Sequence, residues 1–245
     1  MHAISTQRLA KLRQSDREDV QCVSQKNKGA AMLPLLLRGP AANRPVLCIG
    51  AHCDDIEIGC SGTLLRIVRD HPEARVIWAV FSRDEVREGE SRKAAASLLG
   101  SKPELHFFDF RPSFFPTQFE AIKNAFEDLK GRFDPSVVFT HCLHDRHQDH
   151  ALLAQLTWNT FRSHLILEYE IPKYEGDLGH PNLFAPLSAS DLSQKVKVLM
   201  ECFPSQGKRT WFTEDTFRAL ARLRGVECGS STGFAEAFHG RKVCF

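Results

Sequence analysis

Short apolar runs alternate with longer amphipathic segments along most of the chain. Five runs have the β-branched and aromatic character of buried strands, at residues 45–50, 75–81, 105–108, 136–140 and 165–169. Helical periodicity between them predicts helices at 62–70, 90–99 and 118–132, and a further helix that follows residue 150 and ends at Arg162. This alternation predicts an α/β fold: a Rossmann-like, mostly parallel sheet with helices on both faces.

Local signals refine three of these helices. Ser61 or Thr63 can cap the helix at 62–70, and Gly100 can end the helix at 90–99. The helix at 118–132 is predicted to turn one apolar face toward the sheet, formed by Phe119, Ile122, Ala125, Phe126 and Leu129.

The two ends of the chain have a different character. Residues 1–31 are polar and poorly periodic, which predicts a flexible N-terminal extension, and residues 32–245 are predicted to form a single domain. Beyond Ile171 a loop-rich stretch at 173–186 precedes helices at 191–202 and 214–223 and a short-stranded segment at 226–245. We interpret this part as a C-terminal elaboration that forms the substrate pocket.

Composition narrows the class of protein. The 245 residues are 42% hydrophobic and 25% charged, an ordinary globular balance, and the net charge of +2 gives no electrostatic case for nucleic acid or a membrane surface. No apolar run approaches the ~20 residues of a membrane-spanning helix. Eight cysteines without a C-x-x-C pair favour a reduced, cytoplasmic protein without a structural zinc knuckle.

Two polar clusters follow two predicted core strands almost a hundred residues apart. The first is Ala51-His52-Cys53-Asp54-Asp55, and the second is His147-Gln148-Asp149-His150. Because ligands bind beyond the carboxyl ends of parallel strands, both clusters should open on the same edge of the sheet. Three protein ligands and an open position make a catalytic zinc site, for which the candidates are His52, Asp55 and His150. Asp54 could then take a proton from water.

Each cluster also has a simpler interpretation. The His-x-Asp-Asp turn could serve only to cap the following helix, and His150 could be a surface residue of a first helical turn. His141 and His144 are predicted to be loop residues, and Asp145 with Arg146 could be a solvated charge pair.

The two clusters together resemble the motifs of the PIG-L family of zinc-dependent N-deacetylases, also called LmbE-like. The family motif Ala-His-Pro-Asp-Asp matches residues 51–55, with Cys53 in place of proline. Its motif His-Pro-Asp-His matches residues 147–150, with Gln148 in place of proline. The glutamate that follows the aspartate pair in the family is replaced by Ile56, and Glu57 comes one position later.

The resemblance implies an LmbE-like fold and roles for six residues. One Zn²⁺ ion would be held by His52, Asp55 and His150. Asp54 would be the general base that deprotonates a metal-bound water. His147 would be protonated, stabilise the oxyanion and protonate the leaving amine, while Asp149 would hold that imidazole and favour its charged form.

The expected activity is removal of an acetyl or similar small acyl group from the nitrogen of an amino sugar or an N-acetylglucosaminyl-type glycoside. We expect Arg87 to grip a hydroxyl or phosphate of this small-molecule substrate, with Glu90 as its partner. Two alternatives stay open: an amidohydrolase of another conjugate, such as a thiol-sugar, lipid-linked or antibiotic glycoside, and a non-catalytic sugar- or nucleotide-binding module. A homo-oligomer is compatible with the sequence.

Overall fold

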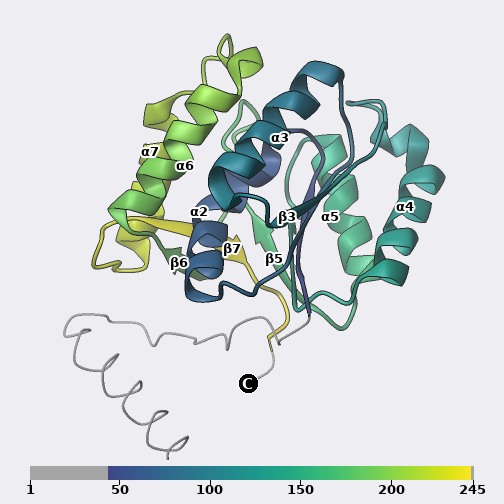
Figure 1. The fold of residues 1–245 in the computed structure, drawn as a ribbon, viewed down its shortest axis with the longest axis horizontal. Helices are drawn as coiled ribbons and strands as arrows, with labels where there is room; N and C mark the ends of the chain where they lie inside the picture. Colours follow the sequence, from purple (N-terminus) through teal and green to yellow (C-terminus); the bar gives the residue numbers. More distant parts are fainter. Residues whose placement is uncertain (1–43, 244–245) are drawn as a thin grey trace, which may run out of the picture. The chain divides into compact units, whose positions relative to one another are not determined.

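The computed structural model describes residues 44–243, which are arranged around a seven-stranded sheet (Figure 1). The strands are β1 (Val46–Gly50), β2 (Val76–Val80), β3 (Pro103–Phe107), β4 (Val137–His141), β5 (Leu165–Tyr169), β6 (Leu183–Pro186) and β7 (Ala235–His239). The helices are α2 (Asp55–Asp70), α3 (Glu85–Leu99), α4 (Phe119–Arg132), α5 (Gln148–Thr160), α6 (Ala189–Cys202) and α7 (Glu214–Glu227), with short 3₁₀ helices η1 (Phe115–Gln118) and η2 (Pro204–Gln206).

The extension predicted for residues 1–31 lies outside the described residues, as does the beginning of the domain predicted for 32–245. That boundary stays a prediction. Within residues 44–243, no helix has both the length and the apolar character that a membrane crossing requires.

The sheet is mostly parallel, as the sequence predicts. Its strand order is β3-β2-β1-β4-β5-β7-β6. Strands β1 to β5 pair in parallel, and β7 and β6 add an antiparallel edge next to β5. The C-terminal segment therefore extends the central sheet through β6 and β7, of which β6 lies in the stretch that was predicted to be loop.

Apolar side chains cover both faces of the sheet. Val46 and Cys48 belong to one buried cluster, and Leu47 and Ile49 belong to the other, as the two-residue period of a strand requires. Helices α4 and α5 lie on one side of the sheet, and α2, α3, α6 and α7 lie on the other (Figure 1). Both faces are covered, which explains the nearly continuous apolar runs of the parallel strands.

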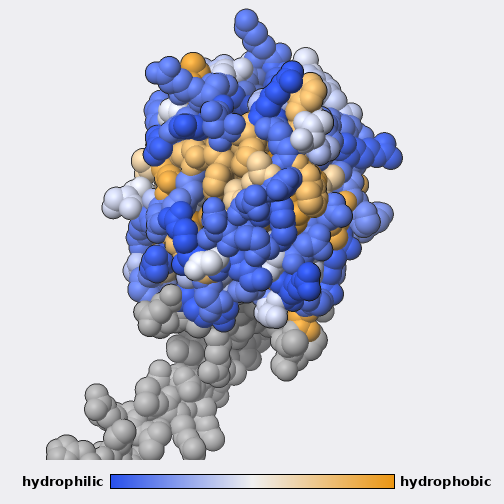
Figure 2. All heavy atoms as spheres, turned by 90° about the vertical axis from the view of Figure 1, so that its right-hand side faces the viewer, coloured by the Kyte–Doolittle hydropathy of each residue, from blue (hydrophilic) through white to orange (hydrophobic). Residues whose placement is uncertain are grey.

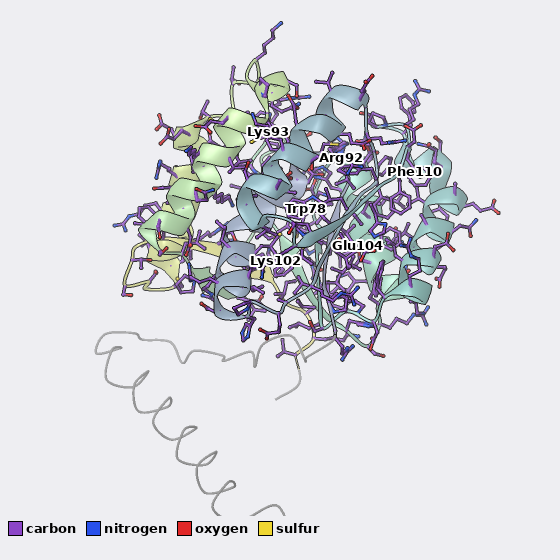
Figure 3. The ribbon with its side chains drawn as sticks, in the orientation of Figure 1. Trp78, Arg92, Lys93, Lys102, Glu104 and Phe110 are labelled. Carbon is purple, nitrogen blue, oxygen red and sulfur yellow. The ribbon has the colours of Figure 1, made fainter. Side chains whose placement is uncertain are left out.

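Aromatic side chains fill the region between the sheet and its helices. Trp78 of β2 is fully buried in the cluster under α2 and α3, and Phe110 packs against the other cluster, close to α4 (Figure 3). Phe119 was expected on the buried face of α4, but it is 47% exposed, and Phe114 before it is 42% exposed. Figure 2 shows this side of the molecule, where apolar atoms gather near the middle of a mostly hydrophilic face.

Helix α2 begins at Asp55, seven residues before the predicted start at Gly62. The predicted caps Ser61 and Thr63 are wrong, because both residues lie inside the helix and Asp54 occupies the N-cap position. The glycines that suggested a loop are points of close packing. A Cβ atom on Gly59 would lie 2.3 Å from the ring of Tyr169. The helix therefore begins directly after the turn that follows β1, and its first residue is the second aspartate of the motif, Asp55.

Helix α3 also begins earlier than predicted, at Glu85 rather than Glu90. The carboxylate of Asp84 accepts a hydrogen bond from the backbone N–H of Arg87 at 2.8 Å, which caps the helix. Gly100 ends it with a positive φ of 66°, as the sequence predicts.

Replacement of Gly59 by alanine should destabilise the fold, because the new methyl group would overlap the ring of Tyr169. We expect a loss of about 1–3 kcal/mol in the free energy of unfolding. Gly89→Ala is the matched control: Gly89 lies inside α3, and a Cβ there meets no atom within 4 Å. That control should gain about 0.5–1 kcal/mol. Denaturant unfolding of both variants measures the difference, and equal stability would contradict the packing argument.

Candidate active site

Parallel pairing of β1 with β4 brings the two polar clusters together. The register aligns Val46 with Val137 and Cys48 with Phe139, so both strands end at the same edge of the sheet. His52 lies in the turn after β1, Asp55 is the first residue of α2, and His150 lies in the first turn of α5. Each of these side chains is supplied by the segment that immediately follows a core strand.

The three predicted metal ligands converge on one point. His52 Nδ1 lies 3.1 Å from His150 Nε2 and 3.4 Å from Asp55 Oδ2. His150 Nε2 lies 3.6 Å from Asp55 Oδ1. Ligand atoms about 2.0–2.1 Å from a tetrahedral zinc ion would be separated by about 3.3–3.4 Å. The donor set therefore fits a divalent metal ion such as zinc. Two groups of donor atoms lie within 4.8 Å of one another and share His150: His52 with His147 and His150, and Asp55 with His141 and His150.

A carboxylate holds the remote nitrogen of each histidine. Asp149 Oδ2 lies 3.3 Å from His52 Nε2, and Asp145 Oδ2 lies 2.9 Å from His150 Nδ1. Such carboxylate–histidine pairs are the usual outer shell of a metal site, because they fix the ring orientation and the tautomer. The sequence assigns Asp145 no role and allows a solvated charge pair with Arg146, whereas Asp145 is buried and forms half of this shell.

The carboxylates around the two histidines stay ionised. Burial opposes the charge of Asp55, but the neighbouring histidines outweigh it and lower its pKa well below the usual range. Asp145 and Asp149 also have lowered pKa values, since their histidine contacts outweigh burial. Burial lowers the pKa of His150 to about 3, so its imidazole is neutral as a metal ligand requires. The centre is rich in buried negative charge.

His147 does not have the environment that the resemblance implied. It caps α5, and its Nδ1 accepts a hydrogen bond from the backbone N–H of Asp149 at 3.3 Å. Burial and the charge of His52 lower the pKa of His147, although the carboxylate of Asp149 acts in the opposite direction. Within the described residues no hydrogen bond or ion pair joins the side chains of His147 and Asp149. The expected Asp149–His147 pair is therefore corrected to Asp149–His52.

Asp149 accepts hydrogen bonds from the loop that precedes α4. Its carboxylate accepts the backbone N–H groups of Ser113 at 2.5 Å and Phe115 at 3.1 Å. The ring of Phe115 stacks against the ring of His52, with 6.3 Å between their centres. Gln148, which stands in place of the family's proline, donates from its side chain to the carbonyl of Ser113 at 3.0 Å. The loop thus fixes both the carboxylate and the ring that it orients.

Asp54 is paired with an arginine of α3. Its Oδ1 accepts from Arg87 Nη2 at 2.7 Å. Burial raises the pKa of Asp54, and the charge of Arg87 opposes that rise. The predicted pair of Arg87 and Glu90 is wrong, because the Glu90 carboxylate instead accepts from the backbone N–H and the hydroxyl of Ser205, at 2.9 and 2.5 Å.

His141 was predicted to be a loop residue, but it is the last residue of β4 and is fully buried. Its Nε2 accepts from the backbone N–H of Ala51 at 3.0 Å and lies 3.2 Å from Asp55 Oδ2. Its ring also stacks on that of His150, with 3.9 Å between centres. The sequence signal that could have placed it is its position directly after the apolar run Val137–Thr140.

Comparison with known proteins identifies the family of this chain. Residues 47–161 match the PIG-L family, described as GlcNAc-PI de-N-acetylase. The chain is 30% identical over 147 residues to the uncharacterized deacetylase YaiS of Escherichia coli K12, a match that covers 56% of this chain and 79% of YaiS. The chain belongs to the PIG-L family. The matched segment of this PIG-L protein contains both polar clusters, from His52 to His150.

Solved structures share the fold of this PIG-L protein. N,N'-diacetylchitobiose deacetylase from Pyrococcus horikoshii superposes with a TM-score of 0.62 at 22% identity, covering 84% of this chain and 87% of that protein. GalB, the 4-carboxy-2-hydroxymuconate hydratase of Pseudomonas putida KT2440, gives a TM-score of 0.65 at 17% identity, covering 82% and 98%. These likenesses confirm the predicted LmbE-like fold. Because a hydratase has it too, the fold alone does not decide the reaction.

Metal affinity should rise with pH in the neutral range. Burial opposes the charge of His52, but hydrogen bonds to Asp149 and Asp55 outweigh it and raise its pKa to about 9. A metal ion needs the neutral ring, so its binding must release this proton. The apparent affinity should therefore fall about tenfold for each pH unit below about 9 and level off above it.

Isothermal titration of metal into the metal-free protein, in buffers of different ionisation enthalpy, counts the released protons. We expect about one proton per metal ion at neutral pH. Binding without proton release would show that His52 is already neutral.

Proposed function

We propose that this PIG-L protein is a zinc-dependent hydrolase that removes an acetyl or similar small acyl group from the nitrogen of an amino sugar or its glycoside. One observation carries the proposal. Two carboxylate-backed histidines and Asp55 lie close together, and Asp54, next to Asp55 in the chain, binds Arg87. A three-ligand set with a separate acid or base residue is the pattern of catalytic rather than structural zinc.

His52, Asp55 and His150 would hold the metal ion. A divalent ion there supplies Lewis acidity, because it polarises a carbonyl oxygen and makes water a stronger nucleophile at neutral pH. The family description and the deacetylase names of related proteins support an amide of acetic acid as the bond that is cleaved.

Asp54 is proposed as the general base. It is buried, its pKa is raised above the ordinary aspartate value, and its Oδ1 is fixed by Arg87. A carboxylate with a raised pKa takes a proton from water more readily than an exposed one. Arg87 then has a second role besides the contact with substrate that the sequence suggested: it orients the base.

His147 is proposed as the hydrogen-bond donor to the reacting amide. Because its Nδ1 accepts a backbone N–H, the proton of its neutral ring lies on Nε2. Its nearest ring neighbours are His150, with 4.5 Å between ring centres, and His52, with 5.0 Å. From there its Nε2–H can donate a hydrogen bond to the developing oxyanion, and the ring can deliver a proton to the nitrogen that leaves only after it has taken up a second proton.

The sequence predicts a substrate pocket formed by the C-terminal elaboration, whereas we propose that the sugar lies beyond the carboxyl ends of β2 and β3. A cavity of about 520 Å³ opens there, lined by Arg83, Asp84, Glu85, Glu88, Gly89, Arg92 and Asp109. The candidate metal ligands, Asp54, His147 and Arg87 are not among its lining residues. Arg87 is in the same turn of α3 and has a buried Nε without a hydrogen-bond partner in the described part of the chain. Glu90 is not proposed as a substrate contact, since Ser205 occupies its carboxylate.

An assay of amine release tests the function. The zinc-loaded protein is incubated with a panel of N-acetylated sugars, glycosides and nucleotide sugars, with and without a chelator. We expect chelator-sensitive release of the amine from at least one amino sugar. Release only from non-sugar amides would replace the proposed substrate class, and no release from any amide by the metal-loaded protein would overturn the proposal.

Replacement of Asp54 by asparagine should remove the base and keep the ligands. We expect kcat to fall by about 10²–10⁴ while zinc content stays near that of the unaltered protein. Asp70→Asn at the exposed C-terminal end of α2 is the control and should keep its turnover. Elemental analysis and amine release measure the two properties. Near-normal turnover in the Asp54 variant would rule out its role as base.

A further inference from the structure

Lys173 is a buried lysine next to the candidate active site, and it lies outside the segment that matches the family. Its Nζ contacts Asp145 Oδ2 at 3.0 Å and both carboxylate oxygens of Asp177, at 2.8 and 2.7 Å. Its side chain is only 7% exposed. A buried ammonium group is costly unless carboxylates compensate its charge, and here two of them do.

The carboxylate of Asp145 connects this lysine to the candidate metal ligands. The oxygen that accepts from Lys173 is also the one that lies 2.9 Å from His150 Nδ1. Its other oxygen accepts the backbone N–H of His147 at 2.8 Å. Asp145 therefore binds both the ring of His150 and the backbone of His147, the residue before α5. Lys173 in turn binds Asp145.

Asp177 reinforces the same segment from the outside. Its Oδ2 accepts the backbone N–H of Arg146 at 2.7 Å while it also binds Lys173. The carboxylates of Asp145 and Asp177 are both nearly inaccessible, with 3% and 6% of their side chains exposed. Without the lysine, the buried carboxylates of Asp145 and Asp177 would lie close together with no positive charge to compensate their repulsion.

We infer that Lys173 is a positioning residue for the metal centre: it keeps Asp145 aimed at His150, so that His150 presents Nε2 to the metal. Loss of the lysine would let Asp145 turn away from His150. That change leaves His150 Nδ1 without its acceptor and weakens the ligand. This inference rests on the proposed metal centre.

Lys173→Met tests it through metal affinity. Zinc dissociation constants are measured by competition with a chromophoric chelator, for the purified full-length variant and the unaltered protein. We expect the affinity to fall by about 10- to 100-fold, as for other outer-shell changes at metal sites. Affinity within about threefold of the unaltered protein would overturn the inference.

The chain offers a closely matched control in Lys195. Its side chain is 8% exposed, it pairs with the buried Glu236 at 2.6 Å, and it also binds a backbone carbonyl, that of Ile58. Lys173 likewise binds the carbonyl of Ile171, at 3.4 Å. Lys195→Met should lower the stability of the metal-free protein as Lys173→Met does, but it should leave zinc affinity within about threefold. Equal losses of affinity in both variants would mark the effect of Lys173 as general destabilisation.

A double variant separates charge balance from packing. Lys173→Met with Asp177→Asn removes the lysine together with the carboxylate that would repel Asp145. We expect it to recover most of the zinc affinity, and an affinity as low as that of Lys173→Met alone would contradict the role of charge. If Lys173→Met does not fold, Lys173→Gln must show the loss of affinity instead, and normal affinity there overturns the inference. If the unaltered protein binds no divalent metal, the proposed metal centre fails rather than the role of Lys173.

Discussion

The structure depends most on how buried negative charge is placed around two imidazoles. Asp55 faces both His52 and His150, and Asp149 and Asp145 hold the outer nitrogens of those rings. Each carboxylate is buried, so each needs a partner that compensates its charge. Histidines, backbone N–H groups and a lysine supply those partners from different parts of the chain. The inner nitrogens of the two rings, His52 Nδ1 and His150 Nε2, face each other beside Asp55.

The sheet makes this concentration of charge possible. Parallel β1 and β4 are neighbours, so segments almost a hundred residues apart in sequence leave the sheet side by side. Helices α2 and α5 begin there, and each has an aspartate in its first turn, Asp55 and Asp149. The N-terminal end of a helix carries unpaired N–H groups and a partial positive charge, which stabilises carboxylates. The scaffold thus offsets part of the cost of assembling the site before any metal binds.

The sequence predicts the parts of the molecule whose signals are local. The apolar run at 165–169 coincides with β5, and the motif residues His52, Asp55 and His150 are brought together as expected. The start of α2 was missed because Gly59 and Gly62 are typical of a loop in the sequence. In the structure they are helical residues that allow the ring of Tyr169 and the side chain of Leu187 to pack closely. The contact between Asp145 and Lys173 was missed for a similar reason. The two residues are 28 positions apart in sequence, and only tertiary packing brings the ammonium group of Lys173 to the carboxylate of Asp145.

The departures from the family motif affect substrate recognition more than the metal centre. Ile56 is fully buried in the apolar cluster, so it gives the substrate no polar contact in place of the family's glutamate. Glu57 does not replace it: it is 1% exposed, and Ser91 of α3 donates to its carboxylate at 2.9 Å. Burial raises the pKa of Glu57 well above the usual value, which favours a neutral side chain in the core. Neither side chain is therefore available for a polar contact with a substrate, so such contacts must come from other residues.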